Sequence, residues 1–279
     1  MTVSAVERCI GLIEALTGAV EPVSLSELAD RAGLPASAAH RILTTLSERG
    51  WVVQDPASQN YALSLRLSTL AFRNLDARLA PDIVQTALDG LAARTREYCR
   101  FAVLEGENLI WVARAQGATA GLRYDPDMGQ EIVLHATANG KAWLAALEEN
   151  EALRIACARG LDRPADFGPN CVRTVDELRA HLNETRRRGY ALAVDEAEIG
   201  TAAIAVAFRA GEGPDAPVAG TISVAGPRLR IGPERYETLA AELARTAEQI
   251  SAMWPLRRRQ RHRRPFAASL ADPVAGAAS

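Results

Sequence analysis

Apolar residues in the first quarter of the chain recur at the three- and four-residue spacing of a helix, in short and separated stretches. Ser4–Leu16 carries the first of them. Its spacing predicts an amphipathic helix that buries one stripe of side chains, namely Val6, Ile10, Ile13 and Leu16. Gly18 and Pro22 then break the pattern, so a compact helical unit is expected at the start of the chain.

Two further helices are expected close together, with one tight turn between them. Ser24 stands three residues before Glu27, which is the spacing of a capping box, so the second helix should begin there and end at Gly33. The third helix is expected over Pro35–Arg49, because proline favours a first helical turn and Gly50 ends the pattern. The inward positions of both helices are apolar: Leu25, Leu28, Ala29, Ile42, Leu43 and Leu46.

A hairpin and a single helix follow. Trp51–Gln54 and Asn60–Leu63 are short strand-like segments, and the turn-rich Asp55–Gln59 joins them. Ser64–Arg78 returns to helical spacing, and Pro81 marks the next boundary. The order helix, helix, turn, helix, hairpin fits a winged helix-turn-helix followed by a linker helix.

The chain from Pro81 to Trp254 alternates between helical and strand-like stretches. Helical spacing occurs at Ile83–Glu97, Thr137–Leu147, Glu151–Arg159, Val175–Arg188 and Glu234–Met253. Strand-like stretches are Tyr98–Leu104, Leu109–Ala115, Gly121–Tyr124, Tyr190–Val194, Ala202–Phe208 and Val218–Val224. Consecutive strands with helices packed around them predict an α+β domain rather than a doubly wound sheet.

The expected organisation has four parts. Residues 1–63 form the helix-turn-helix with its wing, 64–80 the linker helix, 81–255 the α+β domain and 256–279 a tail. The tail carries six arginines against one acid and then Ala, Gly, Pro and Ser, so it is expected to be disordered. Two domains fit 279 residues of which 48% are apolar.

Composition excludes several classes of protein. No apolar run reaches the ~18 residues of a membrane-spanning helix, and the N-terminus lacks the pattern of a secretory signal. The four cysteines lack CxxC spacing, which disfavours a zinc site or a disulfide framework and fits a reducing cytoplasm. They are Cys9, Cys99, Cys157 and Cys171. No cofactor or metal is expected.

The strongest functional signal is the pair of helices around Gly33. A helix-turn-helix lays its second helix in the DNA major groove, with the start of that helix against the base edges. Hydroxyl, imidazole and guanidinium groups there can hydrogen-bond to bases or phosphates, and alanines can approach thymine methyls. The expected DNA contacts are Ala36, Ser37, Ala38, His40, Arg41, Thr44 and Arg31.

A trihelical protein-interaction module would pack in the same way, and the charge of this region favours that alternative. Residues 1–80 hold seven arginines and eight acids, although attraction to phosphates normally supplies much of the affinity for DNA. The hairpin turn also lacks a cation. A local cluster on one face, doubled in a dimer, would supply the missing charge: Arg31, Arg41, Arg49 and Arg66.

Motifs in both halves of the chain resemble those of the IclR family of bacterial transcription regulators. The N-terminal motifs are Ser4-Ala5-Val6-Glu7-Arg8, Leu25-Ser26-Glu27-Leu28-Ala29, Gly33-Leu34-Pro35, His40-Arg41-Ile42-Leu43 and Leu46-Ser47-Glu48-Arg49-Gly50. The C-terminal motifs are His135-Ala136-Thr137-Ala138, Gly140-Lys141-Ala142, Arg186-Arg187-Arg188-Gly189-Tyr190-Ala191, Glu196 and Glu198 before Gly200, Ser223, and Gly226-Pro227. Because several motifs keep their order over about Thr2–Met253, the resemblance is specific.

The resemblance implies a winged helix-turn-helix, a linker helix and a GAF-like effector-binding domain. It implies a homodimer or homotetramer that binds double-stranded operator DNA. The function would be that of a DNA-binding transcriptional regulator, a repressor of a catabolic operon controlled by a small organic acid. No enzymatic activity and no membrane partner are implied.

The resemblance also marks an effector pocket in which this chain departs from the family pattern. Family members that bind small carboxylates tend to have an acid, a cysteine and two serines there. The matching positions are Ala193, Ala203, Ser223 and Ala225. Because a buried carboxylate needs paired donors, the loss of these polar groups favours a larger and more apolar acid, such as an aromatic one.

Two alternatives for this pocket stay open. The pocket could be packed shut, or its donors could be backbone groups near Gly129 and in the turn at residues 134–137. The candidate contacts outside the aligned positions are therefore Gly129, Leu134, His135 and Ala136.

Two other functions are compatible with the residues of the C-terminal half. A hydrolase or isomerase could use Cys99 or Cys171 with His135 or His181, although no motif places them together. A cysteine-based redox sensor is the other alternative. Lys141, the single lysine of the chain, lacks the rest of a phosphate-binding loop, so a structural role at a helix start or a subunit contact is expected for it.

Overall fold

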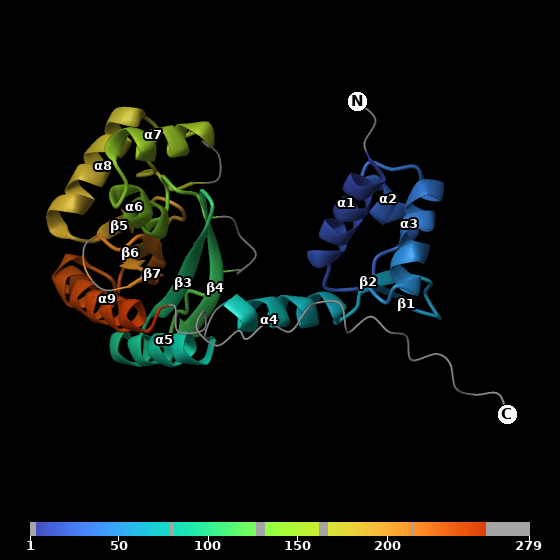
Figure 1. Cartoon of the computed structure of the whole chain (residues 1–279), viewed down its shortest axis with the longest axis horizontal. Coiled ribbons are helices and arrows are strands. Elements are labelled where there is room, and N and C mark those ends of the chain that lie inside the picture. The colour runs from blue at the N-terminus through green and yellow to red at the C-terminus, as the bar shows by residue number, and fades with distance from the viewer. Residues whose placement is uncertain are drawn as a thin grey trace. The chain divides into compact units, whose positions relative to one another are not determined.

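The computed structural model describes residues 4–78, 81–126, 132–161, 167–211, 213 and 215–254. These residues fall into two units, Met1–Arg78 and Leu79–Ser279, which are drawn in Figure 1. The segment 256–279, for which disorder is expected, lies outside the described residues, and so does the candidate residue Gly129.

The first unit consists of three helices, a hairpin and a fourth helix. In chain order they are α1 (Ala5–Thr17), α2 (Leu25–Arg31), α3 (Ala36–Glu48), β1 (Val52–Gln54), β2 (Tyr61–Leu63) and α4 (Arg66–Arg78). Local sequence sets the boundaries: Ser24 Oγ accepts the backbone N–H of Glu27, and Gly33 has a φ of +63°, which favours glycine after the end of α2. The predicted helix-turn-helix with a hairpin is confirmed.

The buried face of α1 agrees with the predicted one only in part. Leu16 is buried as predicted and Ile13 packs partly buried against the core, whereas Val6 is 67% and Ile10 49% exposed and Leu12 is buried in their place. Leu12, Ile13 and Leu16 pack into the core formed with α2 and α3. The expected inward positions of Val6 and Ile10 are therefore wrong, and the helix presents them to solvent.

The second unit is an antiparallel sheet between two groups of helices. Its elements are α5 (Pro81–Thr95), β3 (Tyr98–Glu105), β4 (Asn108–Gln116), α6 (Ala138–Ala145), α7 (Glu149–Ala158), α8 (Val175–Arg188), β5 (Ala191–Val194), β6 (Thr201–Arg209), β7 (Val218–Pro227) and α9 (Pro233–Met253). The five strands lie in the order β4-β3-β7-β6-β5, and each neighbouring pair is antiparallel. This arrangement confirms the predicted α+β class.

The two faces of this sheet are packed in different ways. One face carries large side chains such as Phe101 and Phe208, whose rings stack 4.9 Å apart, and α5 and α9 cover it. The other face carries alanines from β5 and β6, and α6 packs on it through its own Ala138 and Ala142. Figure 1 shows α6, α7 and α8 on this side of the sheet. Small residues on both partners bring α6 close to the sheet.

The expected strand at Gly121–Tyr124 is wrong. This segment has no strand partner, and Gly121 has a φ of +79°, which turns the chain out of the extended conformation. Within the described ranges, no helix combines the length and apolar character needed to cross a membrane.

Candidate functional site

Helix α3 presents a polar edge to solvent. Its inner positions Ala39, Leu43 and Leu46 are buried in the core of the first unit, which directs the residues between them outward. Of the predicted DNA contacts on this helix, Ala38 is half-buried and the others are exposed: Ala36, Ser37, His40, Arg41 and Thr44.

The predicted contacts differ in how their polar groups are engaged. Arg31 pairs with Glu27 at 2.5 Å, so its charge is partly balanced. The Thr44 hydroxyl donates to the carbonyl of His40 at 2.9 Å. For Arg41, no ion-pair partner is found in the described part of the chain. Arg41 is therefore the predicted contact with an uncompensated charge on the polar edge of α3.

The hairpin β1–β2 follows α3 and supplies no positive charge at its turn. Val52 pairs with Leu63 and Gln54 with Tyr61. In the turn, Asp55 accepts the backbone N–H groups of Ala57 and Ser58 at 2.7 and 2.8 Å, which lowers the pKa of its carboxyl. An ionised aspartate would repel a phosphate at this position, so the hairpin turn adds nothing to the DNA contacts predicted for α3.

A small cavity lies in the second unit, on the face of the sheet covered by α6. Two neighbouring rows of paired residues run across the strands here: Ala193–Ala203–Ala225–Tyr98 and Ala191–Ala205–Ser223–Arg100. Because alternate residues of a strand face the same side, both rows belong to one surface. The cavity has a volume of about 50 Å³.

The structure brings most of the predicted pocket positions to this cavity. Those that line it are Ala136, Ala193, Ala203, Ser223 and Ala225. Leu134 and His135 are buried, but neither is among its lining residues. His135 instead contacts the ring of Phe167, with the ring centroids 6.2 Å apart. Their predicted places in the pocket are therefore not found in the structure.

Several polar and aromatic residues that line the cavity were not predicted from the sequence. The most informative is Arg100 on β3, which is 7% exposed. Its guanidinium carbon lies 4.5 Å from the ring centroid of Trp111 and 6.0 Å from that of Tyr124. Alternation along β3 could have placed Arg100 on this face, but only after the register with β7 was known.

A buried ion pair closes one side of the cavity. Lys141 on α6 is fully buried, and its Nζ donates to Oε1 and Oε2 of Glu196 at 2.7 and 2.6 Å. Burial disfavours both charged forms, so it raises the pKa of Glu196 and lowers that of Lys141, while pairing partly offsets both shifts. Lys141 therefore has a structural role, as expected, but within the unit: its ion pair holds the segment after β5 against α6, and its full burial leaves it no place in a subunit contact.

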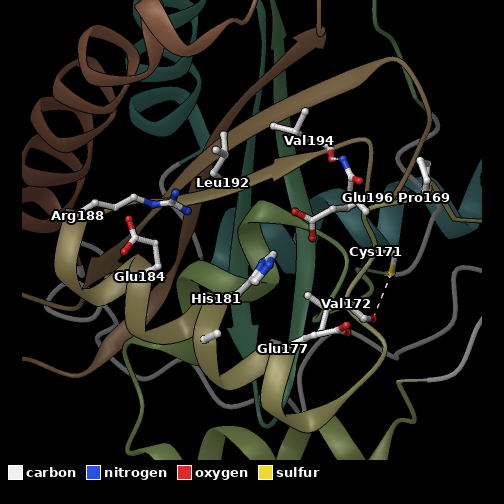
Figure 2. A pocket seen from close by; sticks show the side chains of 12 residues that line it. Pro169, Cys171, Val172, Glu177, His181, Glu184, Arg188, Leu192, Val194 and Glu196 are labelled. Atoms are coloured by element: carbon white, nitrogen blue, oxygen red, sulfur yellow. Dashed lines mark hydrogen bonds between the residues drawn. The ribbon is translucent and has the colours of Figure 1, made fainter.

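A wider groove of about 670 Å³ lies on the other side of Glu196. Figure 2 shows His181 from α8 and Glu196 directed into it, with Cys171 at its edge. His181 Nδ1 lies 3.3 Å from Lys141 Nζ, and burial together with this cation lowers the pKa of the imidazole. The histidine is therefore held neutral beside the ion pair.

The cysteines do not form the constellation that an enzyme would need. Cys99 lies on the opposite face of the sheet, in the core with α5 and α9, while Cys171 shares the groove with His181. Burial raises the pKa of Cys99 to about 12 and also raises that of Cys171. Both thiols are therefore protonated near neutral pH, which makes them weak nucleophiles.

Thiol accessibility gives a direct test of this assignment. Cys157 is exposed, so we expect a thiol reagent to modify it first in the folded protein at pH 7.5. Cys99 should react only after unfolding, because it is buried and protonated. Mass spectrometry of peptides after timed alkylation measures the order, and rapid labelling of Cys99 in the native state would contradict the structure.

Comparison with known proteins gives a consistent result. A family model described as the IclR helix-turn-helix domain matches residues 5–56, and one described as bacterial transcriptional regulator IclR C-terminal matches residues 73–252. The transcriptional repressor IclR of Escherichia coli is 29% identical over 252 residues, which cover 89% of each chain. The glycerol operon regulatory protein of Streptomyces coelicolor is 31% identical over 212 residues, or 73% of this chain and 79% of that one.

Solved structures resemble the fold as well. That of an IclR transcriptional regulator from Alicyclobacillus acidocaldarius is 25% identical and has a TM-score of 0.74. The match covers 90% of this chain and 98% of that chain.

Proposed function

The chain belongs to the IclR family of bacterial transcriptional regulators, and we propose that it represses a catabolic operon until a small organic acid binds its second unit. It is a DNA-binding regulator, and its relatives are regulators rather than enzymes. We propose an organic acid as its ligand, repression as the effect of its binding to DNA, and the cytoplasm as its location.

The polar edge of α3 is the main support for the DNA-binding role. Ser37, His40 and Arg41 are exposed there, while the opposite side of the helix buries an apolar stripe. We propose that two copies of α3 in a homodimer, or in each pair of a homotetramer, enter successive major grooves about 34 Å apart. The operator would then be nearly palindromic. The exposed Val6 and Ile10 on α1 support self-association, because contact with a second copy would bury them.

Arg41→Ala tests this interface. We expect operator binding to weaken by about 1–3 kcal/mol, because an uncompensated guanidinium at the start of a recognition helix contacts a base edge or a phosphate. Fluorescence anisotropy with the chain's own upstream intergenic DNA, at fixed salt, measures the loss.

Arg187→Ala is the matched control, since it removes an exposed arginine that pairs with Glu184 in the second unit. It should bind the operator as the unmodified protein does. Equal affinities for the Arg41→Ala variant and this control would remove Arg41 from the interface. No preference of the unmodified protein for its intergenic DNA over random DNA would overturn the proposal as a whole.

Regulation requires that the acid prefer one arrangement of the protein over another. A ligand shifts such an equilibrium only by its difference in affinity for the two states. The cavity over β6 and β7 is the site we propose, because the positions aligned with the family's effector pocket line it. Its alanine-rich wall supports an acid with an apolar body rather than a strongly polar one.

A further inference from the structure

Arg100 is a buried cation whose hydrogen-bonding groups are unused. Its side chain lines the small cavity, and the residue is 7% exposed. Nε and Nη2 are covered from solvent and have no hydrogen-bond partner among the described residues. Burying such donors without acceptors costs free energy, so an unsatisfied guanidinium in a native structure calls for a partner.

The aromatic residues around Arg100 do not supply that partner. The guanidinium carbon lies 4.5 Å from the ring centroid of Trp111, 5.2 Å from that of Tyr98 and 6.0 Å from that of Tyr124. These cation–π contacts stabilise the charge and fix the plane of the group. They leave unused the in-plane fork of N–H donors, whose geometry matches a carboxylate.

The charges around the cavity also leave Arg100 uncompensated. Glu196 is the acidic residue among those that line it, and both of its carboxylate oxygens bind Lys141. Lys141 and Glu196 therefore neutralise each other, and among the residues that line the cavity Arg100 keeps an unbalanced positive charge, while the exposed Glu198 beside Tyr124 lies outside the lining. One anionic group on a ligand would balance this charge, whereas a second would be buried without a cation.

We propose that Arg100 binds the carboxylate of the effector, and that the effector is a short-chain monocarboxylate with an apolar body. The proposal rests on the effector role of this cavity and names its ligand class. The rest of the wall is apolar, with Ala193, Ala203 and Ala225 on the strands and Trp111 beside Arg100. A free volume of about 50 Å³ holds a few water molecules, which limits the body to a few carbon atoms. The larger, aromatic acid that the sequence favoured is therefore too bulky for this cavity.

Arg100 replaces the polar groups that the family pattern would place on β5, β6 and β7. Ser223 pairs with Arg100 across β7 and β3, and both residues line the cavity. The ligand's carboxylate would therefore lie between the guanidinium and the Ser223 hydroxyl, at the β3 end of the cavity, while its carbon chain would lie over the alanines.

Butyrate, with butyramide and succinate as comparison ligands, tests the proposal. Isothermal titration calorimetry with the full chain should show binding of butyrate and at least about 30-fold weaker binding of butyramide, which has the same shape without the charge. Succinate should also bind more weakly, because its second carboxylate has no partner. Equal binding of butyramide, tighter binding of succinate, or binding of benzoate without butyrate would overturn the ligand class.

Variants of Arg100 test the residue. Arg100→Met should weaken butyrate binding by at least about 30-fold, and Arg100→Lys should retain part of the affinity, since it keeps the charge but loses the fork. Arg114→Met is the matched control. Arg114 stands opposite Arg100 in the register of β3 and β4, and its side chain is about half exposed. Unchanged butyrate affinity in both Arg100 variants would overturn the role of Arg100.

Operator binding separates this inference from the proposed function. If Arg100→Met still binds the operator but no longer responds to butyrate, both stand. If the unmodified protein binds the operator but no monocarboxylate, the inference about Arg100 fails and DNA-binding regulation stands. If it binds butyrate through Arg100 but shows no operator preference, the inference stands and the proposed function fails.

Discussion

Replacing Lys141 by methionine should lower the free energy of unfolding of the second unit by about 3–5 kcal/mol. The substitution leaves Glu196 buried without the cation that holds both of its oxygens. Methionine fills similar space, so the loss reports the unpaired charge more than a cavity. Urea unfolding measures it, followed by tryptophan fluorescence, because Trp111, Trp143 and Trp254 all belong to this unit.

Two further variants separate the unpaired charge from other effects. Lys141→Met combined with Glu196→Gln should recover much of the stability, because neither charge remains buried. Arg187→Met breaks an exposed pair with Glu184 and should cost no more than about 1 kcal/mol. A loss in Lys141→Met as small as that in Arg187→Met would show that the buried pair contributes little.

The deficit of Lys141→Met should depend on pH in a defined direction. Burial already raises the pKa of Glu196, and losing Lys141 raises it further. A carboxyl with a raised folded-state pKa favours folding when it is protonated, so the deficit is largest at alkaline pH and shrinks as the pH falls through that pKa. Urea unfolding at both pH values measures this: the free energy of unfolding of the variant should lie closer to that of the unmodified protein at pH 5 than at pH 8.

The fold was largely predictable because its signals are local. Capping residues, helix-ending glycines and apolar periodicity give the elements of both units, and Val175–Arg188 is found with the bounds that its pattern predicts. The errors arise where the sequence allows two local solutions. Helix α1 carries more apolar residues than one face can hold, and the core takes Leu12, Ile13 and Leu16 and leaves Val6 and Ile10 exposed.

The candidate site was predictable only in part, because it depends on strand register and on pairing between distant residues. Similarity to a family could mark Ala193 and Ala203 as pocket positions. It could not show that Arg100 stands opposite Ser223 or that Lys141 forms an ion pair with Glu196. The members of these two pairs are 123 and 55 residues apart along the chain. The net charge of the cavity follows from these long-range pairs.

Gly140→Ala should destabilise the second unit by about 3 kcal/mol, the upper end of the usual cost of overpacking. Alanine in place of glycine within a helix normally stabilises by about 0.5–1 kcal/mol. Here the sign reverses, because an added Cβ on α6 would lie 2.3 Å from both the Cα and the carbonyl oxygen of Leu134. These are backbone atoms, so the turn at residues 134–137 must move.

Gly11→Ala is the matched control, since Gly11 is inside α1 and an added Cβ there meets nothing within 4 Å. It should raise the stability of the first unit by about 0.5–1 kcal/mol. The turn that Gly140→Ala displaces carries Ala136 and Thr137, which line the small cavity, so this variant should also lose ligand affinity while its helix-turn-helix still binds DNA. Stabilisation by Gly140→Ala would contradict the close approach of α6 to that turn, and the position of this wall of the cavity with it.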